Sequence, residues 1–160
     1  MKLKSENSFM EIYLATKEDE LDLKKHFSHY KNKSVINSRV NCYIGHNNTL
    51  IAKEREKIVG ILQWCAKEDP NAGVAEFEEI FINEEYRGKG IGSRLLERAI
   101  TDVTEFFKNN KIKPRKIFLF ASEDNLAARK LYEKYGFKAI SEVGKLFSDE
   151  EDEIFYCKNL

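Results

Sequence analysis

The segment Arg87-Gly88-Lys89-Gly90-Ile91-Gly92 constrains this chain more than any other part of its sequence. It lies between an apolar, strand-like run that ends at Ile82 and an amphipathic helical pattern over 93–107. Glycines at alternate positions let the backbone approach a ligand closely, because no Cβ is in the way. A helix that begins at about Gly90 directs its free N–H groups and the positive end of its dipole at this loop. The segment therefore predicts a site for an anion such as a phosphate or pyrophosphate.

Two familiar phosphate-binding motifs do not fit the segment. A Rossmann dinucleotide site needs G-x-G-x-x-G directly after a strand. Here the third glycine falls one residue early, and an acidic linker, 83–86, separates the strand from the glycines. A Walker A loop needs Gly-Lys followed by Ser or Thr, which this loop lacks.

Length and charge narrow the class of protein. The chain of 160 residues is the size of one domain, and we expect a flexible tail over 1–9 and a single domain over 10–160. Lys and Arg together number 27, as do Asp and Glu, so the net charge gives no reason to expect nucleic acid or a membrane surface as a partner. The polar start carries no apolar stretch typical of a signal peptide, which favours a cytoplasmic protein.

Cysteines and histidines give no metal motif. Cys42, Cys65 and Cys157 have no CxxC spacing and are interpreted as reduced, mostly packed thiols, and Cys65 and Cys157 are not expected to be nucleophiles. His26 and His29 lie near no cysteine pair. We interpret these two as part of a solvated helix face and expect no metal.

Hydrophobic periodicity predicts an α/β protein with a mixed sheet, in the order β-α-(α)-β-β-β-α-β-α-β-β. Helices are expected from Thr16 to about Tyr30, over 93–107, and from a cap at Ser122 or Asp124 to about Tyr135, where Gly136 ends the helix. Residues 31–48 leave helix and loop both open. The predicted strands cover 10–15, 49–53, 58–66, 74–82, 116–121, 137–143 and 153–158.

Two segments of the chain resemble the motifs of a known family, the GNAT N-acetyltransferase superfamily. The family's acetyl-CoA motif is Arg or Gln, two residues, Gly, one residue, then Gly or Ala, which Arg87 to Gly92 matches. A second block, Asn125 to Phe137, is similar to the family's later motif of Asn, Ala and Tyr with a Gly-Phe ending. The resemblance implies an acetyl-CoA-dependent enzyme whose sheet splays between its fourth and fifth strands.

The resemblance also implies where acetyl-CoA binds. The backbone of Ile80, Phe81 and Ile82 is expected to pair with the pantetheine arm like an added strand. Arg87 is expected either to touch a phosphate or to brace Glu84 or Glu85. Asn125, with Ala128 and Tyr132 on the following helix, is expected to complete the site. The pyrophosphate would lie on the backbone of Gly88, Lys89, Gly90, Ile91, Gly92 and Ser93.

Acetyl transfer needs a neutral amine, whereas an alkyl ammonium with a pKa of about 10.4 is almost fully charged at pH 7. A positioned carboxylate would serve as general base, and the strand over 74–82 carries Glu76, Glu78 and Glu79. Regular alternation would put Glu76 and Glu78 on the face of Ile80, and Glu79 on the other, unless a bulge shifts the faces. By resemblance the base is Glu78 or, second, Glu79.

Tyr132 matches the family's tyrosine and would donate a proton to the thiolate of CoA as the amine attacks directly in a ternary complex. The acidic run 148–153 and the strand glutamates favour a cationic amine, such as a polyamine or an aminoglycoside, although a run of this kind is more often a solvated turn. A peptide or protein acceptor and a non-catalytic acetyl-CoA-binding module stay open. Many family members dimerise, so the resemblance leaves a homodimer open too.

Overall fold

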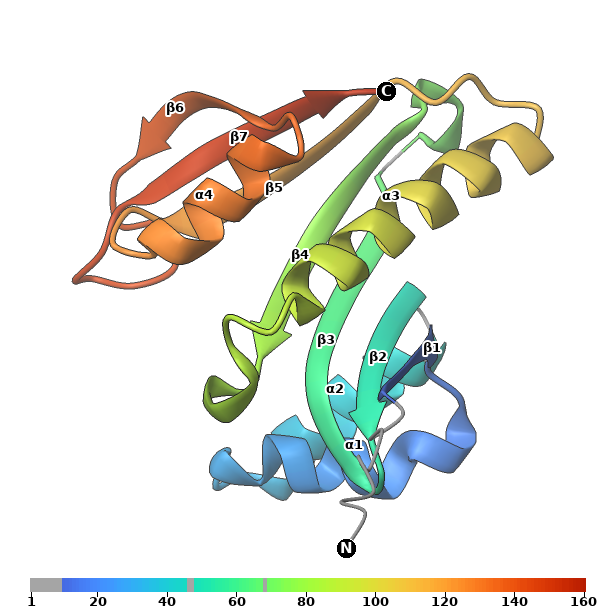
Figure 1. The fold of residues 1–160 in the computed structure, drawn as a ribbon, viewed down its shortest axis with the longest axis vertical. Helices are drawn as coiled ribbons and strands as arrows, with labels where there is room; N and C mark the ends of the chain where they lie inside the picture. The colour runs from blue at the N-terminus through green and yellow to red at the C-terminus, as the bar shows by residue number, and fades with distance from the viewer. Residues whose placement is uncertain (1–9, 46–47, 68) are drawn as a thin grey trace, which may run out of the picture.

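The computed structural model describes residues 10–45, 48–67 and 69–160, so the tail predicted over 1–9 lies outside the described residues. Its elements follow the predicted order. They are β1 (Met10–Leu14), α1 (Glu20–His26), α2 (Lys33–Gly45), β2 (Asn48–Glu54), β3 (Lys57–Ala66), β4 (Val74–Ile82), α3 (Ile91–Asn109), β5 (Lys116–Ser122), α4 (Leu126–Lys134), β6 (Lys138–Val143) and β7 (Glu153–Asn159) (Figure 1). Among the described residues, no helix combines the length and the apolar character needed to cross a bilayer.

The seven strands form one mixed sheet in the order β1-β2-β3-β4-β5-β7-β6. β4 and β5 are its one parallel pair, and they pair only from Val74 to Phe77 against Lys116 to Leu119. Both strands continue beyond that register, and Figure 1 shows them diverging toward the end of the sheet where α3 begins. The predicted splay between the fourth and fifth strands is thus confirmed.

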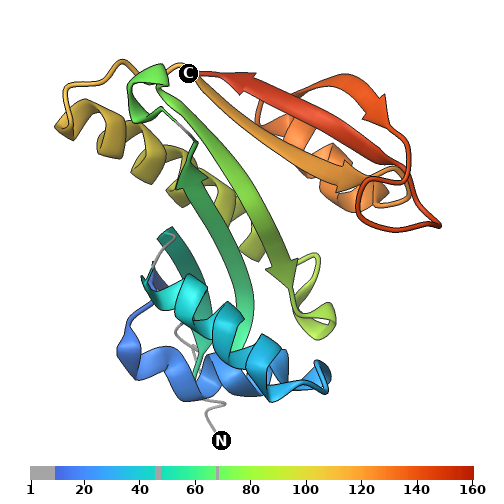
Figure 2. The ribbon, with the colours of Figure 1, turned by 180° about the vertical axis from the view of Figure 1, so that it is seen from behind.

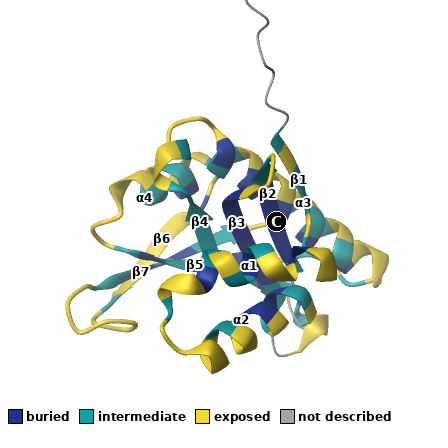
Figure 3. Ribbon diagram, turned by 90° about the horizontal axis from the view of Figure 1, so that it is seen from below, coloured by how far each residue is buried: buried dark blue, intermediate teal, exposed yellow. Residues whose placement is uncertain are grey.

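Helices cover both faces of the sheet and divide the core in two. α3 and α4 pack on one face over a cluster that includes Leu95, Phe107 and Tyr132. α1 and α2 cover the other face beside β2 and β3, where Leu23 and Phe27 are buried (Figure 2). β2 and β3 lie between the helix layers and are the most continuously buried strands (Figure 3).

A β-bulge in β4 overturns the predicted alternation of its side chains. The register with β3 runs from Trp64 opposite Phe77 to Gln63 opposite Glu79, so Glu78 is an extra residue. Consequently Phe77 shares the α3 face with Ile80 and Ile82 instead of lying opposite to them. Regular alternation, which would put Glu76 and Glu78 on the face of Ile80, therefore does not hold, and the bulge that the sequence left open shifts the faces, because the inserted residue reverses the alternation beyond it.

Two predictions about helices are settled. Residues 31–48, left open from the sequence, contain α2, whose buried side chains are Val40 and Tyr43. The cap of α4 is Asn125, whose side chain accepts a hydrogen bond from the Ala128 amide at 3.2 Å, so the expected cap at Ser122 or Asp124 was wrong. Gly136, with a φ of 82°, follows the end of α4 as predicted.

Gly73 controls how β4 begins beside β5, and its replacement is the first test. Its φ is 64°, and a Cβ there would lie 2.1 Å from the carbonyl oxygen of Lys113. Since a left-handed conformation costs a non-glycine residue about 1–2 kcal/mol before any clash, Gly73→Ala should lower the free energy of unfolding by more than about 2 kcal/mol. Urea denaturation measures this loss.

Gly45→Ala is the matched control for that variant. A Cβ at Gly45, the last residue of α2, would have no other atom within 4 Å. We expect it to change stability by less than about 1 kcal/mol, toward stabilisation. Equal losses in the two variants would contradict the account of Gly73.

Candidate active site

A cavity of about 610 Å³ fills the wedge between the end of β4, the loop before α3 and the first turns of α4. We call it the wedge cavity. All residues predicted to hold acetyl-CoA line it, except Lys89. Its other lining residues, which sequence reasoning missed, are Tyr86, Ala127 and Leu131. Ala127 and Leu131 fall inside the Asn125-to-Phe137 block, so the helical period was the signal that could have found them.

The three glycines of the loop have different roles. Gly88 and Gly90 have φ values of 74° and 79°, and a Cβ on either would meet no atom within 4 Å. Their absent side chains therefore serve a left-handed backbone and leave the space above it open. Gly92 has an ordinary φ, but a Cβ there would lie 3.1 Å from Leu131, so this glycine lets α4 pack closely against α3.

The start of α3 faces the wedge cavity with unpaired helix amides. The first helical hydrogen bond runs from the Arg94 amide to the carbonyl oxygen of Gly90, at 3.1 Å. The amides of Ile91, Gly92 and Ser93 therefore have no partner within the helix, and all three residues line the cavity. Together with the helix dipole they make this end of the cavity suited to an anion.

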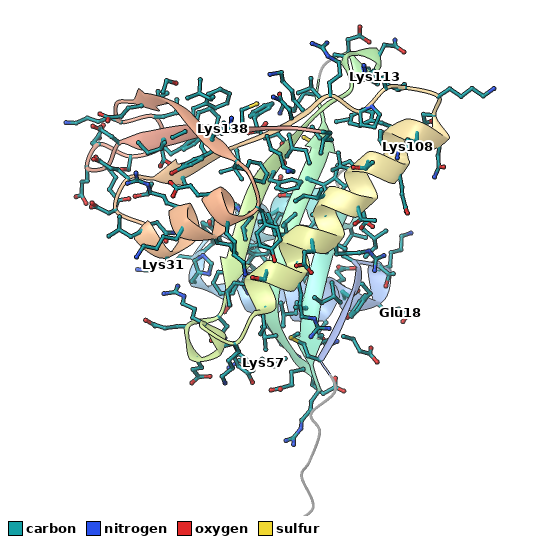
Figure 4. The ribbon with its side chains drawn as sticks, turned by 45° about the horizontal axis from the view of Figure 1, so that its top comes forward. Glu18, Lys31, Lys57, Lys108, Lys113 and Lys138 are labelled. Carbon is teal, nitrogen blue, oxygen red and sulfur yellow. The ribbon has the colours of Figure 1, made fainter. Side chains whose placement is uncertain are left out.

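The charged side chains of the loop are held by the protein itself. Arg87 donates from Nε to the carbonyl oxygen of Ile82 at 3.3 Å and lies 4.0 Å from Glu84. Lys89 extends over the ring of Tyr86, with Nζ 4.7 Å from the ring centroid. Lys57, labelled in Figure 4 beside this loop, lies 3.0 Å from Glu85. Of the two predicted roles of Arg87, the structure has the contact with Glu84.

Tyr132 is buried on α4 and lines the wedge cavity together with Ile80 and Phe81. Its ring packs against Phe137 and Tyr156, with centroids 6.1 and 6.0 Å away. Burial raises the pKa of the Tyr132 phenol above its ordinary value. The phenol therefore keeps its proton at neutral pH and can act as a proton donor.

A second cavity of about 560 Å³ lies against α1 on the opposite face of the sheet. We call it the α1 cavity. Carboxylates and aromatic rings alternate around it, contributed by α1, the turn between β2 and β3, and β4. Phe81 lines both cavities, so β4 is their common wall.

Glu79 is the β4 carboxylate that lines the α1 cavity. One of its oxygens, Oε2, accepts hydrogen bonds from the hydroxyl of Tyr43 and from Nη1 of Arg39, the latter at 3.2 Å. Burial, followed by the charge of Glu79, raises the pKa of Tyr43, so this phenol remains a donor. Arg39 is fixed in turn by the ring of Tyr30, whose centroid is 5.0 Å from the guanidinium carbon.

Glu78, the other predicted base, lies in a different group of side chains. Its Oε1 accepts a hydrogen bond from Sγ of Cys65 at 3.0 Å and lies 3.6 Å from Nζ of Lys67. Lys67 also pairs with Glu76 at 2.6 Å. Burial and the adjacent Glu78 raise the pKa of the Cys65 thiol to about 12, which fits the expectation that this cysteine is not a nucleophile.

His26 departs from its interpretation as a solvated residue. It is half-buried at the end of α1, with its ring edge-on to those of Phe81 and Phe27 at centroid distances of 4.6 and 4.8 Å. The interpretation failed because the helical period alone does not say that β4 packs against this turn of α1. The exposed His29, by contrast, does lie toward solvent.

The acidic run over 148–153 forms a turn between β6 and β7. The hydroxyl of Ser148 accepts from the amides of Glu150 and Glu151, and Glu151 accepts from the hydroxyl of Ser122 at 2.7 Å. Within the described part of the chain, the run is absent from the lining of both cavities. Its contacts are those of a turn, the alternative that the sequence left open.

Comparison with known proteins identifies the family. The model of the acetyltransferase (GNAT) family matches residues 7–137. The chain belongs to the GNAT acetyltransferase family. Among curated GNAT relatives, a spermine/spermidine N(1)-acetyltransferase of Bacillus subtilis is 33% identical over 76 residues, which are 48% of this chain and 47% of the relative. The matched segment thus spans less than half the length of that relative.

Solved GNAT structures share the fold over almost the whole chain. A family member from Elizabethkingia anophelis with acetyl-CoA bound has a TM-score of 0.68 at 20% identity, covering 97% of this chain and all of that one. The ribosomal-protein-S18-alanine N-acetyltransferase of Escherichia coli has a TM-score of 0.74 at 17% identity, covering 94% of each chain. Since the E. coli acetyltransferase acts on a protein, the GNAT fold by itself does not select the acceptor.

The burial of His26 predicts a pH dependence of stability. Burial, and to a lesser extent the neighbouring His29, lowers the pKa of His26 from about 6.5, while Glu79 opposes this. Because the unfolded chain then binds the proton more readily, the contribution of His26 is complete above pH 6.5 and is lost as the pH falls through the lowered pKa. The free energy of unfolding should therefore decline less between pH 7.5 and 5.5 in His26→Gln than in the wild type.

Urea denaturation at several pH values measures that decline. His29→Gln is the control, and it should keep most of the wild-type slope because His29 is exposed. An unchanged slope in His26→Gln would show that another group titrates in this range.

Proposed function

We propose that this GNAT protein is an N-acetyltransferase that moves the acetyl group of acetyl-CoA to a primary amine of a small cationic molecule of the polyamine class. One observation carries the proposal. The wedge cavity and the α1 cavity lie on opposite sides of β4 and share Phe81. A thioester in the wedge cavity and an amine in the α1 cavity would therefore approach each other at Phe81, where β4 has separated from β5.

The wedge cavity has what acetyl-CoA requires at each end. Beyond Phe77, β4 leaves its pairing with β5, so its backbone groups can receive a pantetheine arm as an added strand. The left-handed Gly88 and Gly90 and the amides at the start of α3 suit a pyrophosphate. Asn125 caps α4 beside the same cavity, and Tyr132 follows about two helical turns later on the same side of the helix.

The α1 cavity suits a flexible cation. Its charged lining residues are the carboxylates Asp22, Glu56 and Glu79 and the two cations Lys25 and Lys57, so carboxylates are in excess, and rings such as Phe27 and Phe81 supply apolar surface. A polyamine offers ammonium groups separated by methylenes, which suits a wall with both an excess of carboxylates and apolar surface. The similarity to the spermine/spermidine acetyltransferase of B. subtilis supports the same class of acceptor.

Different residues of the two cavities serve the two proton transfers of the reaction. The amine nitrogen attacks the acetyl carbonyl directly, without an acyl-enzyme, and the carbon–sulfur bond breaks. Tyr132 donates its proton to the departing thiolate. Glu79, rather than Glu78, is the β4 carboxylate that helps to remove the proton of the amine, because Glu79 lines the α1 cavity whereas Glu78 pairs with Cys65 and Lys67.

Thermal unfolding with acetyl-CoA, CoA or NAD⁺ tests the cosubstrate. A ligand at about a hundred times its Kd adds roughly 2.7 kcal/mol, which corresponds to a rise of about 5–11 °C in Tm for a domain of this size. We expect this rise with acetyl-CoA and CoA and none with NAD⁺. An equal rise with NAD⁺, or none with acetyl-CoA, would contradict the proposed role of the wedge cavity.

A thiol-release assay tests the acceptor in the same preparation. Spermidine should give a higher kcat/KM than butylamine, which lacks the further charges, and than a lysine peptide. Turnover of the peptide without turnover of spermidine would favour a protein acetyltransferase. Binding of acetyl-CoA without thiol release from any amine would favour a non-catalytic module.

Tyr132→Phe tests the proton donor. Removal of a general acid typically costs 10²- to 10⁴-fold, so kcat should fall by about 100-fold or more while the Tm rise with acetyl-CoA persists. Tyr135→Phe, at the C-cap of the same helix and hydrogen-bonded to Glu97, is the matched control and should keep wild-type turnover. Unchanged turnover in Tyr132→Phe would refute the assignment.

A further inference from the structure

His26 occupies a position that the family motifs do not mark. It ends α1 and lines the α1 cavity, with its ring against that of Phe81 at 4.6 Å. Because Phe81 also lines the wedge cavity, one side chain separates the imidazole of His26 from the space assigned to acetyl-CoA. An amine entering the α1 cavity toward β4 would pass beside this ring.

The carboxylates of β4 are already engaged by donors. Oε2 of Glu79 receives hydrogen bonds from both Tyr43 and Arg39, and Glu78 receives one from Cys65. These donors hold the Glu79 carboxylate in place on the wall of the α1 cavity, which His26 also lines. Glu79 is therefore positioned to supply a negative charge beside the imidazole of His26.

We propose that His26 accepts the proton of the acceptor amine and that Glu79 is a positioning residue that stabilises the resulting imidazolium. This assignment rests on the proposed acetyltransferase function and extends it. An imidazole is a suitable acceptor because it is neutral at the pH where acetyl transfer must occur.

Acetyl transfer to an ammonium group releases two protons from the nitrogen, and each has a destination. The ammonium nitrogen loses one proton to become a nucleophile, and it loses a second as the carbon–nitrogen bond forms and the carbon–sulfur bond breaks. The sulfur gains a proton from Tyr132, and Tyr132 is reprotonated by one of the two protons that the nitrogen loses. The other leaves to solvent through His26. The net products are the acetamide, CoA thiol and one proton.

The surroundings of His26 favour the neutral ring at pH 7. Burial is the largest cause of its lowered pKa, His29 acts in the same direction, and Glu79 acts against them. Charged and titratable groups surround the ring, and those of α2, Arg39 and Tyr43, reach it only through Glu79, to which both are hydrogen-bonded. On α1 and the turn after it these are Asp22, Lys25, His29 and Tyr30. From the β2–β3 turn and β4 they are Glu56, Lys57 and Glu79.

The test is the pH profile of kcat at saturating acetyl-CoA and spermidine. Wild-type kcat should fall on the acidic side as His26 becomes protonated. In His26→Asn and His26→Gln, kcat at pH 7 should be lower by about 100-fold, and the acidic limb should disappear. Lys24→Gln on α1, outside both cavities, is the control and should keep the wild-type profile.

A second acceptor separates proton removal from a general loss of structure. An aliphatic hydrazide is uncharged at neutral pH, so it does not need the first deprotonation. The His26 variants should therefore lose far less activity with the hydrazide than with spermidine. An equal loss with both acceptors would assign His26 a structural role and overturn the proposal.

The remaining outcomes are distinguishable. A Tm rise with acetyl-CoA that matches the wild type shows that each variant is folded and binds its cosubstrate. An acidic limb that persists in both variants would overturn the role of His26 while leaving the acetyltransferase function in place. Failure of the wild type to release thiol from any amine would instead refute the proposed function itself, and the role of His26 with it.

Discussion

The candidate site depends on the end of pairing between β4 and β5 beyond Phe77 and Leu119. Buried backbone N–H and C=O groups need partners, so a strand edge opened inside a sheet is stable only where solvent or a ligand satisfies it. The divergence creates the wedge cavity, and α3 begins at its open end with unpaired amides. The divergence of β4 from β5 thus provides both free backbone groups along β4 and a cavity that ends at the positive end of the α3 dipole.

β4 is also the wall that the two cavities share. The bulge at Glu78 reverses its alternation, so Ile80 and Ile82 turn toward the α3 core while Glu79 and Phe81 face the α1 cavity. One extra residue in a strand therefore decides which β4 carboxylate lines the α1 cavity. It leaves Glu78 at the group of Cys65 and Lys67 and gives Glu79 to Tyr43 and Arg39.

Local signals accounted for most of the fold. The strands and α3 have strong periodicity, and Gly136 and the glycine-rich loop have conformational requirements that few other residues meet. The signal failed where tertiary packing decides the outcome. α2 buries little beyond Val40 and Tyr43, the bulge depends on pairing with β3, and the burial of His26 depends on Phe81 approaching α1.

The sequence by itself determined the order of the elements, the place of the glycine-rich loop and the family, because these depend on neighbours in the chain. Only the tertiary structure decided which face each β4 glutamate occupies, that Gly92 serves the contact with Leu131, and that His26 meets β4. These properties arise between residues far apart in sequence. Periodicity within one element carries no information about the register or the packing partner of that element.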